Sequence, residues 1–150
     1  MTYGDIYIIG MSKKHSENGL AYGRGYVYAM QYHIVFCTKY RKQVLTGEIA
    51  DDMKTLLRNI SEEYDFKILA LEVMPDHVHI LVDCKPQFNP TDMIKIIKGN
   101  TARLLFIKHP SLKQHLYKGH LWNPSYCITT VSDRTTDIVK EYVESQKSRD

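Results

Sequence analysis

The chain has 150 residues, 43% of them hydrophobic and 25% charged, a composition that fits one soluble globular domain with a buried core. The formal net charge of +3 is too small to require a nucleic-acid partner and does not exclude one, since local clustering matters more than the total. The three cysteines form no Cys-x-x-Cys pair, and no apolar run approaches the ~20 residues of a membrane span, which argues against a thiolate zinc site, a disulfide framework and a membrane protein.

The amino-terminal half predicts an arm, a strand and a helix. Residues 1–25 lack the basic start of a signal peptide, and from residue 12 they are polar and glycine-rich, as in a loop or a mobile arm. Aromatic and β-branched residues predict a long strand over 26–40. Apolar residues at helical spacing predict a helix over 46–64, with Thr46 as a candidate N-cap.

The middle of the chain predicts a hairpin followed by a second long helix. Strands are expected over 67–74 and 77–84, joined by a Pro-Asp turn. A helix over 89–108 follows, with Asn89 as its N-cap and a proline at its first position. Residues 109–120 are expected to be irregular or briefly helical.

The carboxyl-terminal part predicts a fourth strand and a last helix. The strand is expected over 121–132, with a bend near Pro124, because proline cannot donate to a sheet ladder. The helix is expected over 133–146, capped by Ser132 or Asp133.

The element order is therefore β-α-β-β-α-β with an added carboxyl-terminal helix. This order is typical of an α+β fold with a ferredoxin-like or RRM-like antiparallel sheet. Both long helices can cover one face of the sheet and leave the other face for a ligand or a partner. The predicted division is an arm over 1–25, a ferredoxin-like core over 26–131 and a terminal helix over 132–148 that carries the catalytic residue.

Two histidines on the third predicted strand are candidates for a metal site. Side chains alternate along a strand, so His77 and His79 point to one face, with Cα atoms about 6.6 Å apart. Two imidazoles at that separation can converge on one ion, although two solvated histidines on an exposed sheet face fit the pattern too. A catalytic ion needs a third protein ligand. Glu72 lies across the hairpin and can face either way, whereas Asp83 lies roughly 13 Å from His79 along the strand.

A tyrosine and a glutamine on the last predicted helix are candidates for the same chemistry. Ile138, Tyr142 and Gln146 recur four residues apart on one helix face. A glutamine oxygen is a hard ligand suited to magnesium or manganese, and tyrosine can act as a covalent nucleophile. The alternative is that Tyr142 is an ordinary amphipathic core residue. Together with the histidine pair, this helix suggests DNA strand transfer through a phosphotyrosine.

Five segments in a fixed order carry a resemblance to a known family: YHIVFCTKYRK, EVMPDHVHILV, IKGNTARLLF, LWNPSYCITTVS and YVESQ. Over residues 26–146 the chain resembles the small one-tyrosine HUH transposases of bacterial insertion sequences that move as single-stranded DNA. The resemblance implies a homodimer and a divalent metal, Mg²⁺ or Mn²⁺. His77 and His79 match the metal-binding pair of the family, Tyr142 matches the nucleophile, and Gln146 matches the third metal ligand.

The resemblance also implies a reaction. The family cleaves and rejoins single-stranded DNA at insertion-sequence ends through a 5′-phosphotyrosine, and it recognises imperfect hairpins near those ends. Its last helix often completes the active site of the other subunit, so sites shared between subunits are expected. Such an enzyme acts in the cytoplasm of a bacterial or archaeal cell, on nucleoid DNA and away from membranes. The arm around residues 10–22 is longer than in the family pattern.

Several other residues are candidates for contacts with DNA. Tyr126 is a rival nucleophile, but it lies in a strand-like segment, and we interpret it as structural or, like Trp122, as a base-stacking aromatic. Basic residues after the first strand and on the second helix are candidates for phosphate contacts, with a solvated surface as the alternative for each. They are Lys39, Arg41, Lys42, Lys95, Lys98 and Arg103.

Two other functional classes remain open on the sequence alone. A metal-dependent single-strand nuclease would use water in place of the tyrosine, so it would keep its turnover in Tyr142→Phe. A non-catalytic RRM-like module would bind nucleic acid without any metal and would bind equally well after His77→Ala.

Overall fold

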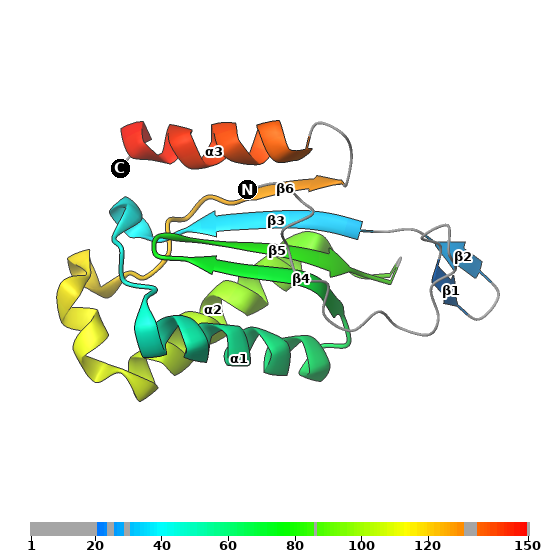
Figure 1. The fold of residues 1–150 in the computed structure, drawn as a ribbon. Coiled ribbons are helices and arrows are strands. Elements are labelled where there is room, and N and C mark those ends of the chain that lie inside the picture. Colours follow the sequence, from blue (N-terminus) through cyan, green and yellow to red (C-terminus); the bar gives the residue numbers. More distant parts are fainter. Residues whose placement is uncertain (1–20, 24–25, 29–30, 86, 131–134, 150) are drawn as a thin grey trace.

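A four-stranded antiparallel sheet forms the centre of the protein in the computed structural model, which describes residues 21–23, 26–28, 31–85, 87–130 and 135–149 (Figure 1). The strands run in the order β4-β5-β3-β6, and every neighbouring pair is antiparallel. Their bounds are β3 (Gln31–Cys37), β4 (Lys67–Met74), β5 (His77–Asp83) and β6 (Cys127–Thr130). This order is that of a ferredoxin-like sheet, so the predicted α+β fold is confirmed.

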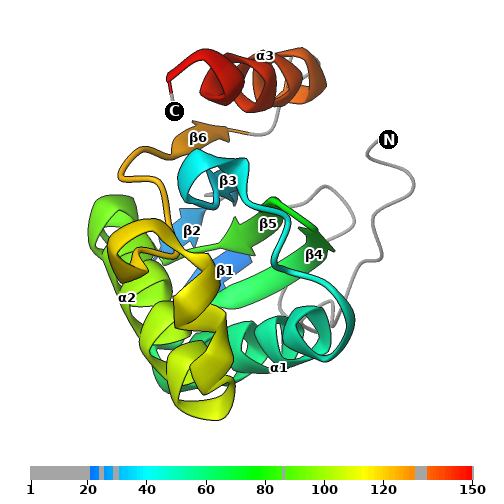
Figure 2. The same ribbon diagram turned by 90° about the vertical axis from the view of Figure 1, so that its left-hand side faces the viewer.

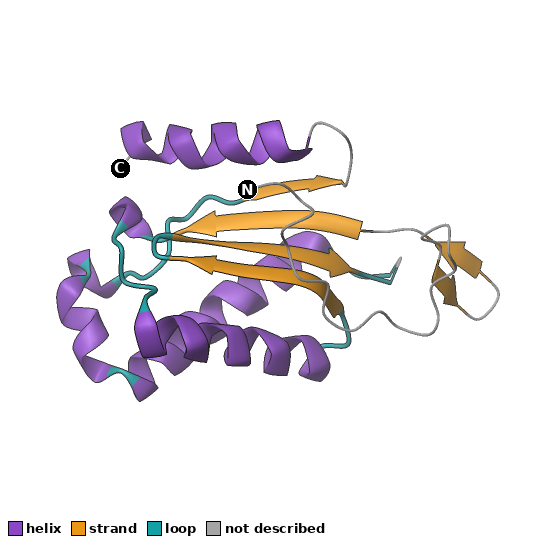
Figure 3. Cartoon of the chain, in the orientation of Figure 1, coloured by secondary structure: helices purple, strands orange, loops and turns teal. Residues whose placement is uncertain are grey.

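Long helices lie on both faces of this sheet. Helices α1 (Gly47–Glu63) and α2 (Pro90–Lys108) lie on one face, and α3 (Thr135–Arg149) lies on the other, as Figures 2 and 3 show. Short 3-10 turns occupy the connections: η2 (Lys39–Arg41), η3 (Pro110–His115) and η4 (Tyr117–Gly119). Within the described residues, no helix is long and apolar enough to cross a membrane.

The hydrophobic core lies between the sheet and the two helices α1 and α2. Alternate residues of β3 and β5 point into it, among them Ile34, Phe36 and Ile80, which are fully buried. Met53 of α1 and Ile97 of α2 belong to the same buried cluster. Because these strands use every second residue for the core, the intervening residues of β3 and β5 point to the opposite face of the sheet, where α3 packs against β3 and β6.

Local signals position the helix starts as predicted. The Asn89 side chain accepts a hydrogen bond from the backbone N–H of Thr91 at 3.0 Å, with Pro90 in the first turn of α2. Thr46 precedes α1 at its N-cap position, but its side chain makes no capping hydrogen bond. The following residue, Gly47, has a φ of 55°, a left-handed conformation that glycine adopts without strain.

The strand predicted over 26–40 is divided. Its first part, β2 (Tyr26–Tyr28), pairs with β1 (Ala21–Gly23) in a separate two-stranded sheet. Residues 21–23, predicted as loop, are therefore a strand, because they pair with a neighbouring segment of the chain. The arm before residue 21 and the predicted cap residues 132 and 133 lie outside the described residues.

The strand predicted over 121–132 is regular only from Cys127 to Thr130. Before it, Trp122 makes a single bridge with Thr38, and the backbone N–H of Asn123 donates to the carbonyl of Cys37 at 2.9 Å. The next residue is a proline, which has no N–H to donate, and this accounts for the break in the ladder.

Candidate metal and nucleophile site

The two predicted histidines lie together on the face of the sheet that α3 covers. The ring centroids of His77 and His79 are 4.8 Å apart. A third histidine, His33 of β3, lies 5.4 Å from His79, measured between ring centroids. The strand register explains this neighbour, since His79 pairs with Val35 and His33 is two residues away along β3. His33 was not a predicted site residue, because no motif connects it with the other two histidines.

Burial keeps two of these imidazoles neutral. Desolvation, with a smaller effect of the neighbouring histidines, lowers the pKa of His79 to about 3. Desolvation also lowers the pKa of His33 to about 4. Both rings are therefore uncharged at neutral pH, which is the form that binds a metal. Nδ1 of His79 is buried and has no hydrogen-bond partner within the described parts of the chain, and such an unpaired group typically costs about 1–3 kcal/mol.

Asp76, in the turn before β5, holds the other histidine. Its Oδ1 lies 2.6 Å from Nδ1 of His77, and its Oδ2 accepts from Nε of Arg41 at 2.9 Å and lies 2.7 Å from Nη2. Burial raises the pKa of Asp76, but the hydrogen bonds and charges of His77 and Arg41 outweigh it and lower the pKa overall. The sequence pattern indicated only a turn at Asp76, although its place directly before the histidine motif was a usable signal.

Tyr142 and Gln146 meet a common partner. The hydroxyl groups of Tyr142 and Ser125 are 2.8 Å apart. Gln146 is 1% exposed, and its Oε1 accepts from Nδ2 of Asn123 at 2.9 Å and from Oγ of Ser125 at 3.1 Å. The predicted sharing of one helix face is thus observed. The segment from Asn123 to Ser125 is a part of this cluster that no sequence motif indicated.

The histidine cluster and the tyrosine cluster lie at the same end of the sheet. Asn123 binds the carbonyl of Cys37, and Cys37 pairs with His77 in the ladder. The carboxyl-terminal end of α3 and the β4–β5 turn accordingly lie at one end of the molecule in Figure 1. The side chain of Gln146 is hydrogen-bonded to Asn123, Ser125 and Ser145.

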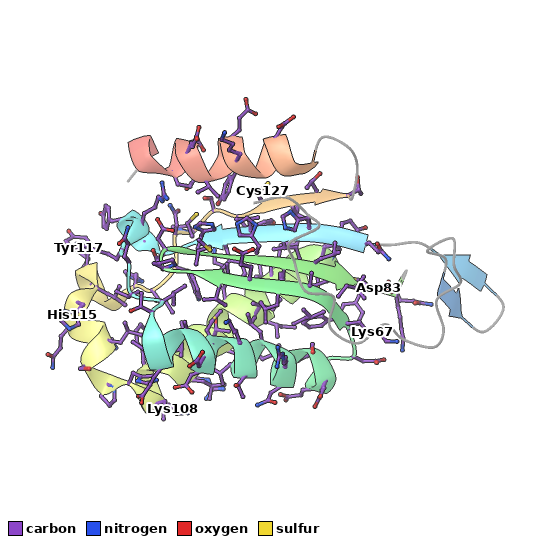
Figure 4. The ribbon with its side chains drawn as sticks, viewed as in Figure 1. Lys67, Asp83, Lys108, His115, Tyr117 and Cys127 are labelled. Carbon is purple, nitrogen blue, oxygen red and sulfur yellow. The ribbon has the colours of Figure 1, made fainter. Side chains whose placement is uncertain are left out.

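The two carboxylates considered as a third metal ligand, Glu72 and Asp83, do not form a three-residue metal site with His77 and His79 among the described residues. Glu72 pairs directly with His79, so it shares the face of the histidines. Asp83 pairs with Gln31 and Lys67 at the far end of the sheet, where Figure 4 shows it. Across the described ranges, no three His, Cys, Asp or Glu side chains are arranged to hold a metal ion.

Two of the predicted DNA contacts, Trp122 and Lys98, have hydrogen-bond partners within the protein. Trp122 is only 8% exposed, packs edge-on against Phe36 and donates from Nε1 to Oγ1 of Thr101 at 3.1 Å, so it is a core residue that cannot stack on bases. Lys98 donates from Nζ to the carbonyls of Asn123 at 2.6 Å and Ser125 at 3.1 Å. Burial lowers the pKa of Lys98 to about 8, and its amine supports the 123–125 segment.

The remaining basic candidates differ in their surroundings. Lys42 and Lys95 are exposed, and Nζ of Lys39 lies 5.0 Å from the ring centroid of Tyr40. Arg103 is exposed and donates to a side chain on its own helix at 3.2 Å. Arg41 is committed to Asp76 through two of its nitrogens.

Tyr126, the rival nucleophile, is half-buried and packs against the hydrophobic core. Its position favours the structural interpretation.

Comparison with known proteins decides the family. The family model described as "Transposase IS200 like" matches residues 26–146. The chain belongs to the IS200-like transposase family. The family predicted from the five segments, and the prediction that the chain is an enzyme, are both confirmed.

Two curated relatives of this IS200-like transposase match most of its length. The ISDra2 transposase TnpA of Deinococcus radiodurans is 48% identical over 128 residues, which are 85% of this chain and 91% of the relative. The transposase for insertion sequence element IS200 of Salmonella typhimurium is 30% identical over 134 residues, which are 89% of this chain and 86% of the relative.

Solved structures share the fold of this transposase. A crystal structure of a protein assigned as a transposase of Deinococcus radiodurans R1 superposes with a TM-score of 0.80 at 48% identity, covering 83% of this chain and 96% of that chain. A REP-associated tyrosine transposase, solved bound to a REP hairpin, has a TM-score of 0.53 at 18% identity, with 82% of this chain and 67% of that chain covered. The second likeness concerns the fold alone.

Proposed function

We propose that this transposase cleaves and rejoins single-stranded DNA at the ends of an insertion sequence, with Tyr142 as the nucleophile. The observation that carries the proposal is the position of α3. This helix packs against β3 and β6, on the face of the sheet that bears His77 and His79. It presents Tyr142 and Gln146 side by side at the same end as those histidines. A tyrosine hydroxyl and a carboxamide oxygen thus belong to one element beside a pair of imidazoles.

The residues present fit a divalent metal, Mg²⁺ or Mn²⁺. His77 and His79 would hold it, with the carboxamide oxygen of Gln146 as the third protein ligand. The buried Nδ1 of His79, which has no hydrogen-bond partner among the residues that the structure describes, and the neutral form of its ring support this assignment. When bound, the metal neutralises charge on the scissile phosphate.

The reaction exchanges one phosphodiester for another. The Tyr142 oxygen attacks phosphorus and loses its proton, the bond from phosphorus to the 3′-oxygen breaks, and that oxygen leaves as a 3′-hydroxyl after taking up a proton. The reverse attack by the 3′-hydroxyl of another strand restores the phosphodiester and the tyrosine. A free phenol, with a pKa of about 10, is a weak nucleophile at neutral pH, so positioning is needed. The Ser125 hydroxyl, 2.8 Å from that of Tyr142, is suited to hold the phenol in place.

The surface beside the site suits an unpaired DNA strand. Tyr40 and Tyr117 are 38% and 55% exposed and meet edge to face, with ring centroids 5.5 Å apart. Lys39 and Lys118 lie over these two rings. Exposed aromatic rings flanked by ammonium groups bind single strands by stacking on bases and by attracting phosphates. The turn η2 contains Lys39 and Tyr40 and contacts α3, so it adjoins the helix of the proposed nucleophile. Recognition of hairpins near the ends of the element rests on the family resemblance.

We also propose that the protein is a homodimer whose sites are shared between subunits, and that it acts on nucleoid DNA in the cytoplasm of a bacterial or archaeal cell. Within the chain, Oε1 of Gln146 accepts two hydrogen bonds from the 123–125 segment. Each subunit of a homodimer makes these same bonds, so a metal site that uses Gln146 requires the last helix to release the 123–125 segment, as an exchange of that helix between subunits would do.

The direct test uses labelled single-stranded element ends. The wild-type protein with Mg²⁺ or Mn²⁺ should form a covalent protein–DNA band and release a fragment with a 3′-hydroxyl. Excess EDTA, His77→Ala and His79→Ala should each reduce that band to background. EDTA removes the metal, and each substitution removes one of the two neighbouring histidine ligands. Full cleavage in EDTA contradicts the metal role. Cleavage without any covalent band would favour the water-dependent nuclease.

Two lysines one turn apart on α2 should behave differently in DNA binding. Lys95→Ala should make the slope of log affinity against log salt shallower by somewhat less than one unit, because a single-strand phosphate contact contributes about 0.7. Lys98→Ala should leave the slope unchanged and lower the free energy of unfolding by about 1–2 kcal/mol, because two backbone carbonyls lose this donor. Salt titrations of binding and urea unfolding measure both. A shallower slope with unchanged stability in Lys98→Ala would restore Lys98 as a phosphate contact.

A further inference from the structure

The Asp76 carboxylate is divided between two partners. Oδ2 is approached by two nitrogens of Arg41, Nε at 2.9 Å and Nη2 at 2.7 Å. Oδ1 is left for Nδ1 of His77, at 2.6 Å. Asp76 is 7% exposed, so water competes little for either oxygen. A buried carboxylate with this much hydrogen bonding has a defined orientation.

The backbone around Asp76 is held by the segment that leaves β3. The carbonyl of Asp76 accepts from the N–H of Thr38 at 2.9 Å and from its hydroxyl at 3.2 Å. The carbonyl of Pro75 accepts from the N–H of Leu45 at 2.9 Å. These three bonds fix the β4–β5 turn relative to Arg41.

Arg41 reaches Asp76 through an unusual backbone conformation. Tyr40 and Arg41 have φ values of 56° and 50°, in the left-handed region that residues other than glycine seldom adopt. Strained positions of this kind are concentrated at functional sites, where the surrounding contacts maintain them. Here the left-handed conformation is accompanied by the contacts of Arg41 with Asp76 and of Thr38 with the β4–β5 turn.

The contact between Oδ1 of Asp76 and His77 determines which nitrogen of His77 carries a proton. An ionised carboxylate only accepts hydrogen bonds, so Nδ1 of His77 must be the donor to Oδ1. In a neutral imidazole the other nitrogen, Nε2, then has the free lone pair that a metal requires. A histidine that ligates a metal through one nitrogen commonly donates the other N–H to a carboxylate, which also sets the ring orientation.

We propose that Asp76 and Arg41 are positioning residues, which fix His77 with its proton on Nδ1 and with Nε2 open to a metal ion. The metal part of this inference rests on the proposed function. The tautomer is a property of the metal-free protein and can be measured without DNA.

Asp76→Asn is the informative substitution because it conserves shape and exchanges one acceptor for a donor. The two Arg41 nitrogens require an acceptor, so the Asn oxygen will face Arg41 and its NH₂ group will face His77. Nδ1 of His77 must then accept, which moves the ring proton to Nε2 and blocks that nitrogen. In a ¹H–¹⁵N imidazole spectrum of the metal-free protein, above the usual titration range of histidine, the His77 signals should change from the Nδ1–H to the Nε2–H pattern. Affinity for Mn²⁺ alone, measured by calorimetry, should fall about 10- to 100-fold.

Asp52→Asn is the matched control. Asp52 also accepts from a cationic side chain, that of Lys108 at 2.7 Å, and lies 2.5 Å from Nε2 of a histidine, His109. Asp52 belongs to α1 and Lys108 to the end of α2, on the face of the sheet opposite α3, where Figure 4 labels Lys108. The control should leave the His77 tautomer and the Mn²⁺ affinity at their wild-type values.

Two results would overturn the proposal. One is a wild-type His77 that carries its proton on Nε2, which is decisive even if Asp76→Asn does not fold. The other is a folded Asp76→Asn protein that keeps the Nδ1–H pattern or binds Mn²⁺ with unchanged affinity.

Arg41→Lys provides a second variant with a different expected result. It retains the carboxylate and should keep the Nδ1–H tautomer, but Mn²⁺ binding should weaken, because one ammonium cannot reproduce the two-nitrogen contact. Unchanged Mn²⁺ affinity in this variant removes Arg41 from the proposal. If the tautomer and Mn²⁺ results hold while no DNA is cleaved, the proposed reaction fails and the positioning role stands.

Discussion

Replacing Tyr142 by Phe is expected to eliminate the covalent protein–DNA adduct while leaving binding to a DNA hairpin near its wild-type strength. The phenol oxygen is the proposed nucleophile, and the substitution removes little else. The variant loses the 2.8 Å contact with Ser125, at a cost of about 0.5–1.5 kcal/mol in the free energy of unfolding, so the fold should survive. The measurements are adduct yield on a denaturing gel and hairpin affinity by fluorescence anisotropy.

Tyr126→Phe is the matched control for this loss. It removes the same atom from a tyrosine that is half-buried against the core, and it should leave the adduct yield unchanged. An adduct mapped by mass spectrometry to Tyr126 would contradict the assignment of the nucleophile. Retained cleavage in Tyr142→Phe, without an adduct, would instead point to water as the nucleophile.

Mixing two inactive proteins, His77→Ala and Tyr142→Phe, is expected to restore part of the adduct yield after subunit exchange. If the last helix serves the partner's histidines, a heterodimer contains one intact site, built from Tyr142 of the first chain and the histidines of the second. Random exchange at equal concentrations makes about half of the dimers mixed, so about one quarter of the wild-type sites should be regained. With tags of different size on the two chains, the DNA should attach only to the His77→Ala chain.

The same experiment distinguishes shared sites from sites built within one chain. In the second case neither site of a heterodimer is intact, and verified heterodimers would give no adduct. The structure makes this distinction informative, because α3 lies on the histidine-bearing face of its own sheet while Gln146 is hydrogen-bonded to Asn123 and Ser125. Mixtures of His77→Ala with His79→Ala are the control. Both remove a ligand from the same strand, and for either arrangement every site of their heterodimer lacks one histidine.

Much of the fold could be predicted because its signals are local. Apolar residues at helical spacing indicated α1 and α2, and Asn89 caps α2 with the predicted hydrogen bond. Alternation along β5 placed His77 and His79 on one face before any partner strand was known. The same strand properties did not reveal where the first strand divides, because β1 and β2 are defined by pairing with each other.

The site shows the same division between local and distant information. The amino-acid sequence by itself determined the order of the long helices and sheet strands from β3 onwards, the shared face of His77 and His79, and the shared helix face of Tyr142 and Gln146. Each of these depends on residues within two turns or one strand. Only the tertiary structure decided that Arg41 binds Asp76, 35 residues away, and that Asn123 binds Gln146, 23 residues away.

Tertiary packing also decided the positions of side chains whose residue type does not tell whether they are buried or exposed. A lysine on an amphipathic helix is equally suited to solvent or to a buried carbonyl, and Lys98 turns inward because the 123–125 segment passes beside α2 with two carbonyls to satisfy. Trp122 enters the core because its bridge with Thr38 brings it against Phe36. His33 joins the other histidines through the register of β3 with β5, a property of two strands that neither strand carries alone.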